Sequence, residues 1–523
     1  MLNLNIPGAD PVLQHTVETR PKAVAEWLGR LPFASPADTA RQLVMALYGL
    51  NRHPLGEDDR SALLALYSPA VARAAASLEA QLAESGVPPH TQQRQLGALL
   101  RELHIEHSIG YKQVLQALTR RRFGRAHPKR MAETTARLLA ALRDILAACD
   151  LTHTPAPAGV WQDMHQLHAY ARASNLADTA ADDAPSATLA YCQALLLALA
   201  DPPHMSHAEL ACTRLYLDKF AALAVLAAAP VDGHHGFSIQ TDVDAPPGHF
   251  ATGQAPGALW LDTDALCRHL HETAVRLRTG ETPRRIGLPA GMESELSQTL
   301  CKRLLKQWSA GAQRAFRRFA TPGTMQMVAG VSAIHRLLEL EPKAAQGEPD
   351  GADSVRIPDV ETAHAAPVVV NATRWTVSND SAAGLALSGT PDAPLNLKVG
   401  DPLGLRADAT AAWSLGVIRW IRMRDARQVE LGIERLSPQI QPVWVQPLRG
   451  HRKASPEPAL FVPGLAALQQ KDRLLLPRHL YQIGMDADVR HPPHQYTLTF
   501  GRRIEQTPSY DLIDFTIFAD EAS

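Results

Sequence analysis

Cysteine is scarce in this sequence and is never paired. The five cysteines among 523 residues stand far apart, and no two have the Cys-x-x-Cys spacing. This excludes a disulfide framework and a cysteine-based zinc knuckle. An excess of charge is absent too, because 52 Lys and Arg residues balance 53 Asp and Glu residues. A surface dedicated to nucleic acid is therefore not expected.

Long apolar segments are also missing. The longest uninterrupted apolar run is residues 220–229, far short of the roughly 20 residues that a membrane-spanning helix needs. No basic leader followed by an apolar stretch opens the sequence. We therefore expect a soluble, cytoplasmic protein with no membrane span.

The sequence lacks the usual signatures of catalysis. It has no His-Glu-x-x-His pair, no Gly-x-Ser-x-Gly elbow, no Walker loop and no Gly-x-Gly-x-x-Gly between a strand and a helix. The 22 histidines include dense groups such as Cys267, His269 and His271, but no carboxylate stands at a diagnostic spacing beside them. The sequence therefore predicts a protein that is not an enzyme and has neither a metal site nor a cofactor.

The first half of the chain is rich in alanine and leucine. Between residues 16 and 229, apolar residues recur at spacings of three and four between polar, proline or glycine breaks, which is typical of helices. The predicted helices are residues 37–50, 60–67, 69–85, 91–103, 132–148, 185–199 and 207–228. Helix starts are expected at Ser35, Ser68 and Ser206, the first two of which precede a proline.

The composition changes after this helical array. Residues 231–258 are predicted to form a loop with one strand near Phe237, followed by helices at 263–278 and 294–319. Residues 341–366 are an acidic, proline-rich insertion. From residue 367 onwards, short β-branched and aromatic runs alternate with turn residues. Six of these runs suit a small barrel, namely residues 368–377, 384–387, 402–406, 413–422, 428–434 and 442–447.

The predicted fold class is a multidomain α+β protein. It has an α-helical N-terminal array, a six-stranded antiparallel β-barrel and an extra C-terminal β segment. The expected parts are a helical domain at 1–230, a loop, strand and connecting helices at 231–312, the barrel with its insertion at 313–449, and the C-terminal segment at 450–523.

One stretch carries polar residues at a defined spacing. Asn379, Ser381 and Gly384 form an Asn-x-Ser-x-x-Gly pattern between two predicted strands. Short polar side chains fold back on their own backbone at such turns, and glycine allows a conformation or a close approach that other residues cannot adopt. The turn is expected to present amide donors and a hydroxyl group; the alternative is an ordinary hairpin turn.

This stretch resembles the PilZ domain, a bacterial receptor module for the second messenger cyclic di-GMP. In that family an Arg-x-x-x-Arg segment precedes the first strand of a six-stranded barrel, and an Asp/Asn-x-Ser-x-x-Gly turn follows it. Arg314 and Arg318 match the first element. Residues 399–401, 413–420 and 429–434 are similar to later strands of PilZ modules. The resemblance covers about residues 313–448, a quarter of the chain.

The resemblance implies a PilZ-like barrel that binds cyclic di-GMP without catalysis. The ligand carries two phosphodiester charges and two guanines, and the arginine fork can bind a phosphate or a guanine edge and stack on a purine. The implied ligand-binding residues are Arg314, Arg317, Arg318, Asn379, Asp380, Ser381 and Gly384.

The arginine assignment has a rival. Sixty residues separate Arg318 from Asn379, where the family has a much shorter connection. Arg121 and Arg125 have the same spacing of four within the basic run 120–130. We prefer Arg314 and Arg318 because they directly precede the change to β structure.

We therefore expect a cyclic di-GMP receptor whose helical region passes ligand occupancy to a protein partner. Motility, pili or surface polysaccharide are the outputs that the resemblance implies. The alternative is a non-enzymatic helical scaffold or adaptor with a degenerate PilZ-like barrel that does not bind nucleotide. Nucleic-acid binding by residues 120–130 is a third possibility, against which the near-zero net charge counts. Four tryptophans are expected in the barrel core or rim: Trp375, Trp413, Trp420 and Trp444.

Overall fold

The computed structural model divides into two compact units, Met1–Ser85 with Pro89–Arg314, and Gly86–Pro88 with Ala315–Ser523. The segment Gly86–Pro88 belongs to the second unit because Val87 and Leu397 exchange two backbone hydrogen bonds of 2.8 Å. The structure describes residues 2–8, 17–120, 128–179, 185–248, 258–292, 294–309, 323–344, 372–381, 384–391, 395–408, 410–425, 427–449, 452–453, 455–464, 470–491 and 494–520.

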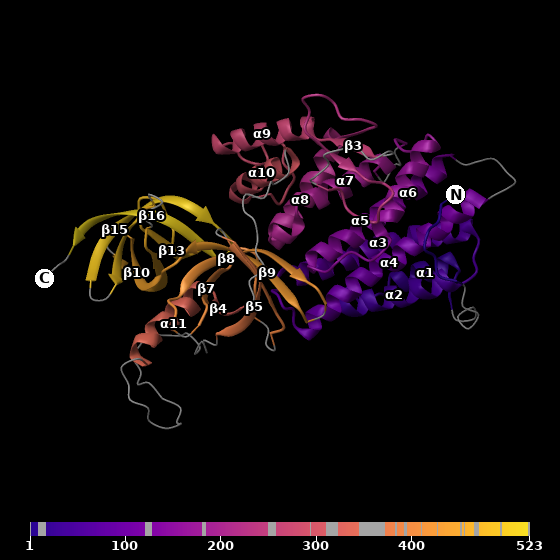
Figure 1. Ribbon diagram of the computed structural model, residues 1–523. Helices are drawn as coiled ribbons and strands as arrows, with labels where there is room; N and C mark the ends of the chain where they lie inside the picture. The colour runs from indigo at the N-terminus through magenta and orange to yellow at the C-terminus, as the bar shows by residue number, and fades with distance from the viewer. Residues whose placement is uncertain are drawn as a thin grey trace, which may run out of the picture. The chain divides into compact units, whose positions relative to one another are not determined.

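The first unit is an array of helices (Figure 1). Their buried apolar side chains form one continuous hydrophobic core. Its α-helices are α1 (Pro21–Leu28), α2 (Pro36–Arg52), α3 (Glu57–Ala83), α4 (Thr91–Arg120), α5 (Pro128–Leu151), α6 (Val160–Ala173), α7 (Ala187–Leu199), α8 (His207–Phe220), α9 (Asp264–Arg278) and α10 (Ser294–Ser309). α4 packs against α2, α3 and α5, and α5 packs against α6 and α7. The predicted helical array is confirmed.

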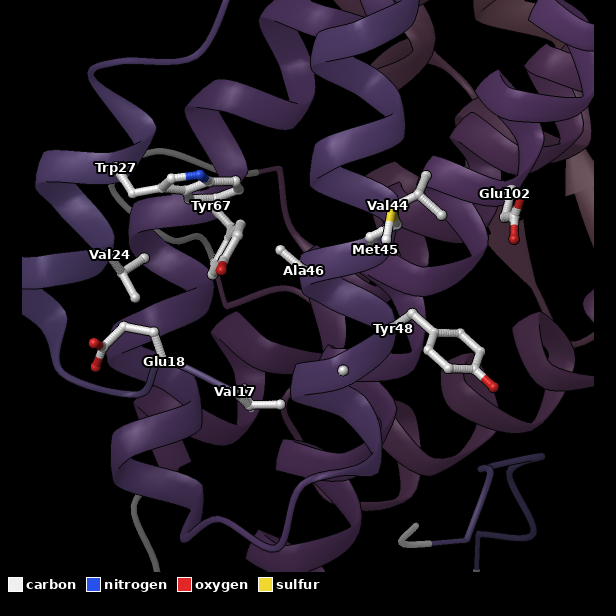
Figure 2. Close-up of a pocket in the computed structure, with 11 residues that line it drawn as sticks. Val17, Glu18, Val24, Trp27, Val44, Met45, Ala46, Tyr48, Tyr67 and Glu102 are labelled. Carbon is white, nitrogen blue, oxygen red and sulfur yellow. The ribbon is translucent and has the colours of Figure 1, made fainter. Parts of the chain in front are cut away.

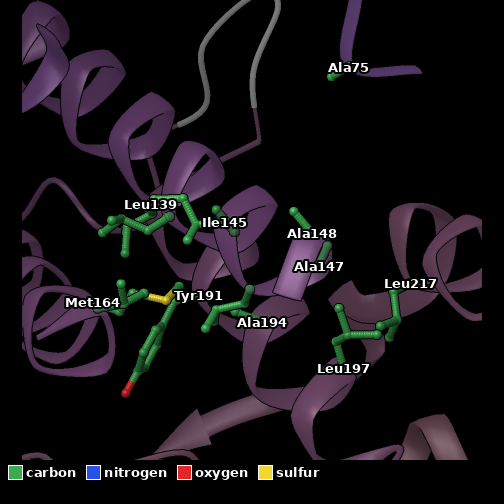
Figure 3. Close-up of a cluster of buried hydrophobic side chains, with 14 of the residues drawn as sticks. Ala75, Leu139, Ile145, Ala147, Ala148, Met164, Tyr191, Ala194, Leu197 and Leu217 are labelled. Atoms are coloured by element: carbon green, nitrogen blue, oxygen red, sulfur yellow. The ribbon is translucent and has the colours of Figure 1, made fainter. Parts of the chain in front are cut away.

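α7 lies at the centre of this core. α7 is apolar on almost all sides, and such a helix is stable only when other parts of the protein surround it. Tyr191 and Leu195 of α7 are accordingly fully buried. Figure 3 shows Tyr191 beside Met164, with Leu139 and Ile145 on the neighbouring helix. Burying each large aliphatic side chain stabilises the fold by about 1.5–3 kcal/mol.

α3 continues through Pro69, where the sequence predicts a new helix. The proline lies inside the helix, although it removes one backbone hydrogen bond. Ser68 does not cap a helix start: its hydroxyl lies 2.8 Å from Tyr111 Oη and 3.0 Å from His107 Nε2, both on α4. The prediction of two helices was wrong because packing of α3 against α4 overrides the local sequence signal.

The predicted start at Ser206 is confirmed as a capping box. Ser206 Oγ accepts a hydrogen bond from the backbone N–H of Glu209, and the Glu209 carboxylate accepts one from the backbone N–H of Ser206. The two bonds satisfy backbone donors that the first turn of α8 would otherwise leave unpaired.

A small sheet follows α8, where the sequence predicts helix as far as residue 228. α8 ends at Phe220, and β1 (Val225–Ala227) pairs with β3 (Leu259–Asp262), which also pairs with β2 (Gly236–Ile239). The strand near Phe237 was predicted correctly. The helix prediction for the end of this run was wrong because its partner strand lies more than 30 residues away in the sequence, beyond the reach of local periodicity.

Among the described residues, α3 has the length and composition of a helix that could cross a membrane. Its most apolar 18-residue window has a mean hydropathy of 1.2 and is 44% buried. Leu63, Leu64 and Leu78 of this helix are completely buried in the core of the first unit. Core helices of this kind meet the same length and composition criteria.

Asp150, at the end of α5, should make stability depend on pH. Burial raises the pKa of its carboxyl group to about 7, against the lowering effect of Arg214, whereas an unfolded aspartate titrates near pH 4. The folded state therefore holds a proton that the unfolded chain has released, and the free energy of unfolding falls as pH rises from about 4 to about 7.

We expect Asp150→Asn to remove this fall and to stabilise the protein at pH 8 by at most about 4 kcal/mol. Chemical denaturation of both proteins at pH 4.5 and pH 8 measures the effect. An identical pH dependence in the two proteins would contradict it.

The second unit starts with a closed antiparallel barrel in the order β4-β5-β6-β9-β8-β7. Its strands are β4 (Thr324–Ala329), β5 (Thr373–Ser381), β6 (Gly384–Gly389), β7 (Pro402–Arg406), β8 (Ser414–Met423) and β9 (Val429–Ser437). Alternate side chains such as Leu385, Leu387 and Ile433 fill the interior. The predicted six-stranded barrel is confirmed. Its sixth strand is β4, which closes it onto β5 and β7, and not residues 442–447.

Residues 442–447 belong to a second barrel, which is the predicted C-terminal β segment. Its strands are β10 (Gln441–Arg449), β12 (Glu457–Val462), β13 (Arg473–Pro477), β14 (Asp486–His491), β15 (His494–Gln506) and β16 (Tyr510–Asp520), and the short β11 (Arg452–Lys453) extends from β10. β10 pairs with both β12 and β14, which closes the ring of six strands.

The two barrels share a hydrophobic cluster. α11 (Val331–Ala344) contacts β4 and β7 of the first barrel and β10, β12 and β13 of the second. Ile334 of α11 lies in one buried cluster with Trp413 of the first barrel and Tyr510 of the second. The barrels of this unit are therefore joined by apolar packing.

Candidate functional site

The Asn-x-Ser-x-x-Gly pattern forms the hairpin between β5 and β6, with Ser381 paired to Gly384. Ser381 Oγ donates a hydrogen bond of 2.8 Å to the Gly384 carbonyl, and the Ser381 backbone N–H donates one of 2.7 Å to Asp380 Oδ1. These bonds hold the hydroxyl and the backbone at fixed positions. The motif lies at a turn between two strands, as expected, and its Ser381 hydroxyl group is bonded within the hairpin.

A bulge in β5 decides which way the motif side chains point. Val377 pairs with Leu387 and Asn379 pairs with Ala386, so Ser378 is an extra residue in the ladder. An extra residue reverses the alternation of side chains along a strand. Asn379 and Ser381 therefore point away from the barrel core that Val377 contacts, while Asp380 lies on the opposite face of β5.

Asp380 is bound by an arginine that the sequence analysis did not identify. Arg435 Nη2 of β9 lies 2.9 Å from Asp380 Oδ1 and 3.0 Å from Oδ2. Both side chains are about one-third exposed, 37% for Arg435 and 35% for Asp380. The pair brings a guanidinium group to the edge of the hairpin. No local signal points to it, since 55 residues separate the two.

Gly384 is needed for a close backbone approach. A Cβ atom at this position would lie 2.3 Å from the carbonyl oxygen of Ile433 on β9. The sequence allowed two roles for this glycine, a special backbone conformation or a close approach of the backbone. The structure shows the close approach.

The outward side chains near the hairpin come from four adjacent strands. Backbone pairing places one row across β5, β6, β9 and β8: Asn379, Ala386, Gly432 and Trp420. The next row contains Ser381, Gly384 and Glu434. We call these seven residues the motif face.

Trp420 reaches the motif face through a second bulge. Ile418 pairs with Ile433 and Trp420 pairs with Gly432, which leaves Arg419 as the extra residue in β8. The Trp420 indole lies over Gly432, where a Cβ atom would be 1.8 Å from the indole nitrogen. The half-buried ring has the Arg422 guanidinium 5.5 Å from its centroid. An aromatic ring beside a cation suits the stacking of a purine.

Arg419 connects the motif face to the second barrel. Its Nε donates to Glu434 Oε2 at 2.6 Å, and its Nη1 donates to Glu505 Oε1 of β15 at 2.5 Å. Burial alone would lower the pKa of Arg419, but the hydrogen bond and charge of Glu505 and the charge of Glu434 outweigh it and raise the pKa. Tyr510 of β16 donates to the other Glu505 oxygen at 3.1 Å.

The structure places three of the seven predicted site residues on the motif face: Asn379, Ser381 and Gly384. A fourth, Asp380, lies on the opposite face of β5 and is bound by Arg435. The other three, Arg314, Arg317 and Arg318, lie outside the described residues, as do the rival pair Arg121 and Arg125.

Two of the four tryptophans are core residues, as expected. Trp375 is 1% exposed and Trp413 is 4% exposed. Trp444 is half-buried and donates a hydrogen bond of 2.7 Å to Glu339 of α11. Trp420 alone among the four belongs to the motif face.

A cavity of about 600 Å³ lies in the first unit, between α1 and α2 (Figure 2). Its walls are mostly apolar and include Trp27 and Tyr67. The described residues that line it contribute two carboxylates, Glu18 and Glu102, and no lysine or arginine. This chemistry does not suit a ligand with two phosphate charges, so the motif face remains the candidate site.

Three family models match consecutive parts of the chain. Residues 22–230 match the model for the N-terminal domain of the cyclic-di-GMP receptor FimW. Residues 237–341 and 351–442 match the model for the middle PilZ domain of that receptor. Residues 443–518 match the model for the FimW C-terminal β-barrel domain. The middle match includes the whole motif face and extends the resemblance upstream of the barrel.

A curated relative shows the same relationship over nearly the whole length. The cyclic-di-GMP receptor FimW of Pseudomonas aeruginosa is 26% identical over 572 aligned positions, which cover 98% of this chain and 93% of the relative. The order of the matched domains agrees with the helical region and the two barrels of the structure. The chain therefore belongs to the PilZ-domain family, in the three-domain form that the FimW models describe.

Proposed function

We propose that this protein is a cyclic di-GMP receptor, that the ligand binds on the motif face, and that the helical region passes ligand occupancy to a protein partner. The related protein is named as a receptor for this ligand, and its middle domain model matches the barrel. The observation that carries the proposal is the outward row in which Asn379 and Trp420 lie on the same face of four paired strands.

The chemistry of the motif face fits a guanine dinucleotide. Asn379 offers a donor and an acceptor to a base edge, and Ser381 offers a hydroxyl group. Trp420 offers a ring for stacking, which is worth about 1–3 kcal/mol per base. Arg435 lies outside the motif face, beside the hairpin, where its guanidinium group can form charge-assisted bonds to a phosphate. Binding of this kind needs no nucleophile, general base or metal ion.

We assign the phosphate clamp to Arg314 and Arg318. Both lie within residues 237–341, which match the middle PilZ model, and they precede β4 in the sequence. Arg121 and Arg125 lie within the residues that match the N-terminal domain model. Two guanidinium groups compensate the two phosphodiester charges of the ligand.

Calorimetric titration of the full chain with cyclic di-GMP, with GTP as a control ligand, tests the proposal. We expect selective binding that is weakened about tenfold or more by Asn379→Ala, Ser381→Ala, Arg314→Ala or Arg318→Ala, as for lost hydrogen bonds to a charged ligand. Thr376→Ala is the matched control, because Thr376 is an exposed hydroxyl residue on β5 outside the motif face.

Each other result has a defined meaning. Selective binding that is indifferent to Arg314 and Arg318 moves the clamp to Arg121 and Arg125. Absence of binding contradicts the receptor function and leaves the helical scaffold with a degenerate barrel.

Transmission to the helical region is tested by hydrogen exchange of the full chain. Because the proposed ligand joins an arginine segment to a distant hairpin, its binding should favour one arrangement of the intervening segments. We expect slower exchange across residues 294–332 when cyclic di-GMP is added. Unchanged exchange over this range, in a protein that binds the ligand, would contradict transmission and leave binding intact.

A further inference from the structure

Glu434 is the acidic member of the motif face. Its backbone pairs with Gly384 of the Asn-x-Ser-x-x-Gly hairpin, and 48% of its side chain is exposed. Arg419 binds one of its oxygens, Oε2, at 2.6 Å. A carboxylate at this position is unexpected on a surface that binds an anion, because it repels phosphate.

The guanine base gives this carboxylate a partner. The Watson–Crick edge of guanine carries two adjacent donors, N1–H and the N2 amino group. A carboxylate accepts hydrogen bonds only, and its two oxygens can take two parallel bonds. Adenine places an acceptor at N1 and lacks the N2 amino group, so the same carboxylate disfavours it.

The geometry of β9 places Glu434 beside a base stacked on Trp420. The Trp420 ring lies over Gly432, two residues before Glu434 on the same face of the strand. Two residues of a strand span about 7 Å, which is close to the width of a purine. A base that stacks on the ring and extends towards the hairpin therefore has its edge near the Glu434 carboxylate, whereas Glu430 lies two residues from Gly432 on the other side.

Arg419 holds this carboxylate in place. It occupies the bulge in β8, and Glu505 of the second barrel fixes its other end at 2.5 Å. Arg419 is thus a positioning residue, and the second barrel contributes to the site through Glu505.

We propose that Glu434 determines the base specificity of the site by accepting hydrogen bonds from N1–H and the N2 amino group of one guanine of cyclic di-GMP. This inference rests on the proposed receptor function and names the group that selects guanine.

The test compares cyclic di-GMP with cyclic di-IMP, in which hypoxanthine keeps O6 and N1–H but lacks the N2 amino group. Calorimetric titration of the full wild-type chain should show a preference for cyclic di-GMP of about ten- to a hundredfold. In Glu434→Gln the affinity for cyclic di-GMP should fall by a similar factor, and the two ligands should bind within about threefold of each other. Removing the N2 amino group from the ligand and removing the carboxylate from the protein should therefore not have additive effects, as expected for two groups in direct contact.

The matched control is Glu430→Gln. Glu430 lies on the same strand and also binds an arginine, Arg424 at 2.7 Å, but its neighbour on β6 is Ser388, away from the hairpin. This variant should keep both the affinity and the preference of the wild type. Thermal melting verifies that each variant is folded, and Glu434→Ala provides a second variant with the same expected loss of preference.

The outcomes separate the two proposals. If the wild type binds cyclic di-GMP and a folded Glu434 variant keeps the full preference over cyclic di-IMP, the role of Glu434 is wrong and the receptor function stands. If the wild type binds neither ligand, the receptor function fails and the inference about Glu434 fails with it.

Discussion

Alanine in place of Gly384 should lower the melting temperature of the barrel unit by roughly 6–12 °C and abolish cyclic di-GMP binding. The added Cβ atom would lie 2.3 Å from the Ile433 carbonyl oxygen, and this oxygen belongs to a backbone that is paired on both sides. The strands must therefore separate, which costs about 3 kcal/mol as other overpacked sites do. The hairpin that carries Asn379 and Ser381 moves with β6.

The matched control for this prediction is Gly404→Ala in β7 of the same barrel. A Cβ atom there would meet its nearest atoms, on the Ile334 side chain, at 3.4 Å, which a side chain accommodates by a small shift. This variant should change the melting temperature little and keep ligand binding. Differential scanning calorimetry and titration measure both properties. Equal melting temperatures for Gly384→Ala and the wild type would refute the close-approach argument.

The hairpin was accessible from the sequence because its signal is local. Asn379, Ser381 and Gly384 lie within six residues of one another, and the turn chemistry of these residue types does not depend on distant partners. The strands around it were also predicted, since their β-branched and aromatic runs are local features. A family resemblance then supplied what the residues alone did not, namely the ligand.

The rest of the motif face depends on strand register, which no single stretch of sequence contains. Trp420 and Glu434 join the hairpin only because β6 pairs with β9 and β9 pairs with β8. A bulge shifts register by one residue and turns every later side chain to the other face. No local sequence pattern indicates that Ser378 and Arg419 are the extra residues of the two bulges.

The same limit explains the wrong assignments in the fold. Residues 442–447 read as the last strand of the first barrel, although β10 pairs with β11, β12 and β14, which all follow it in the sequence. β4 was missed as a barrel member, because its partner β7 lies more than 70 residues away. Local propensity identifies strands, and tertiary pairing assigns them to a sheet.

Replacing Arg419 by methionine should destabilise the unit of two barrels by about 2–3 kcal/mol. The substitution leaves the carboxylates of Glu434 and Glu505 close together without the guanidinium group that binds both. Loss of one partner of a buried ion pair costs 3–5 kcal/mol, and the effect here is smaller because 32% of the Arg419 side chain is exposed. Urea denaturation at neutral pH measures the loss.

An ion pair of the same barrel with a more exposed guanidinium group provides the control. Arg424 lies 2.7 Å from Glu430 and its side chain is 64% exposed, while that of Glu430 is 17% exposed, so Arg424→Met should cost less than Arg419→Met. The double variant Arg419→Met with Glu505→Gln should be more stable than the sum of the single losses by about 1–2 kcal/mol, since removing the second charge relieves the repulsion. Strict additivity would mean that Arg419 does not couple the motif face to the second barrel. Coupling of the expected size would give that barrel a defined role, because a contact 2.5 Å long would then join it to the residue that positions Glu434.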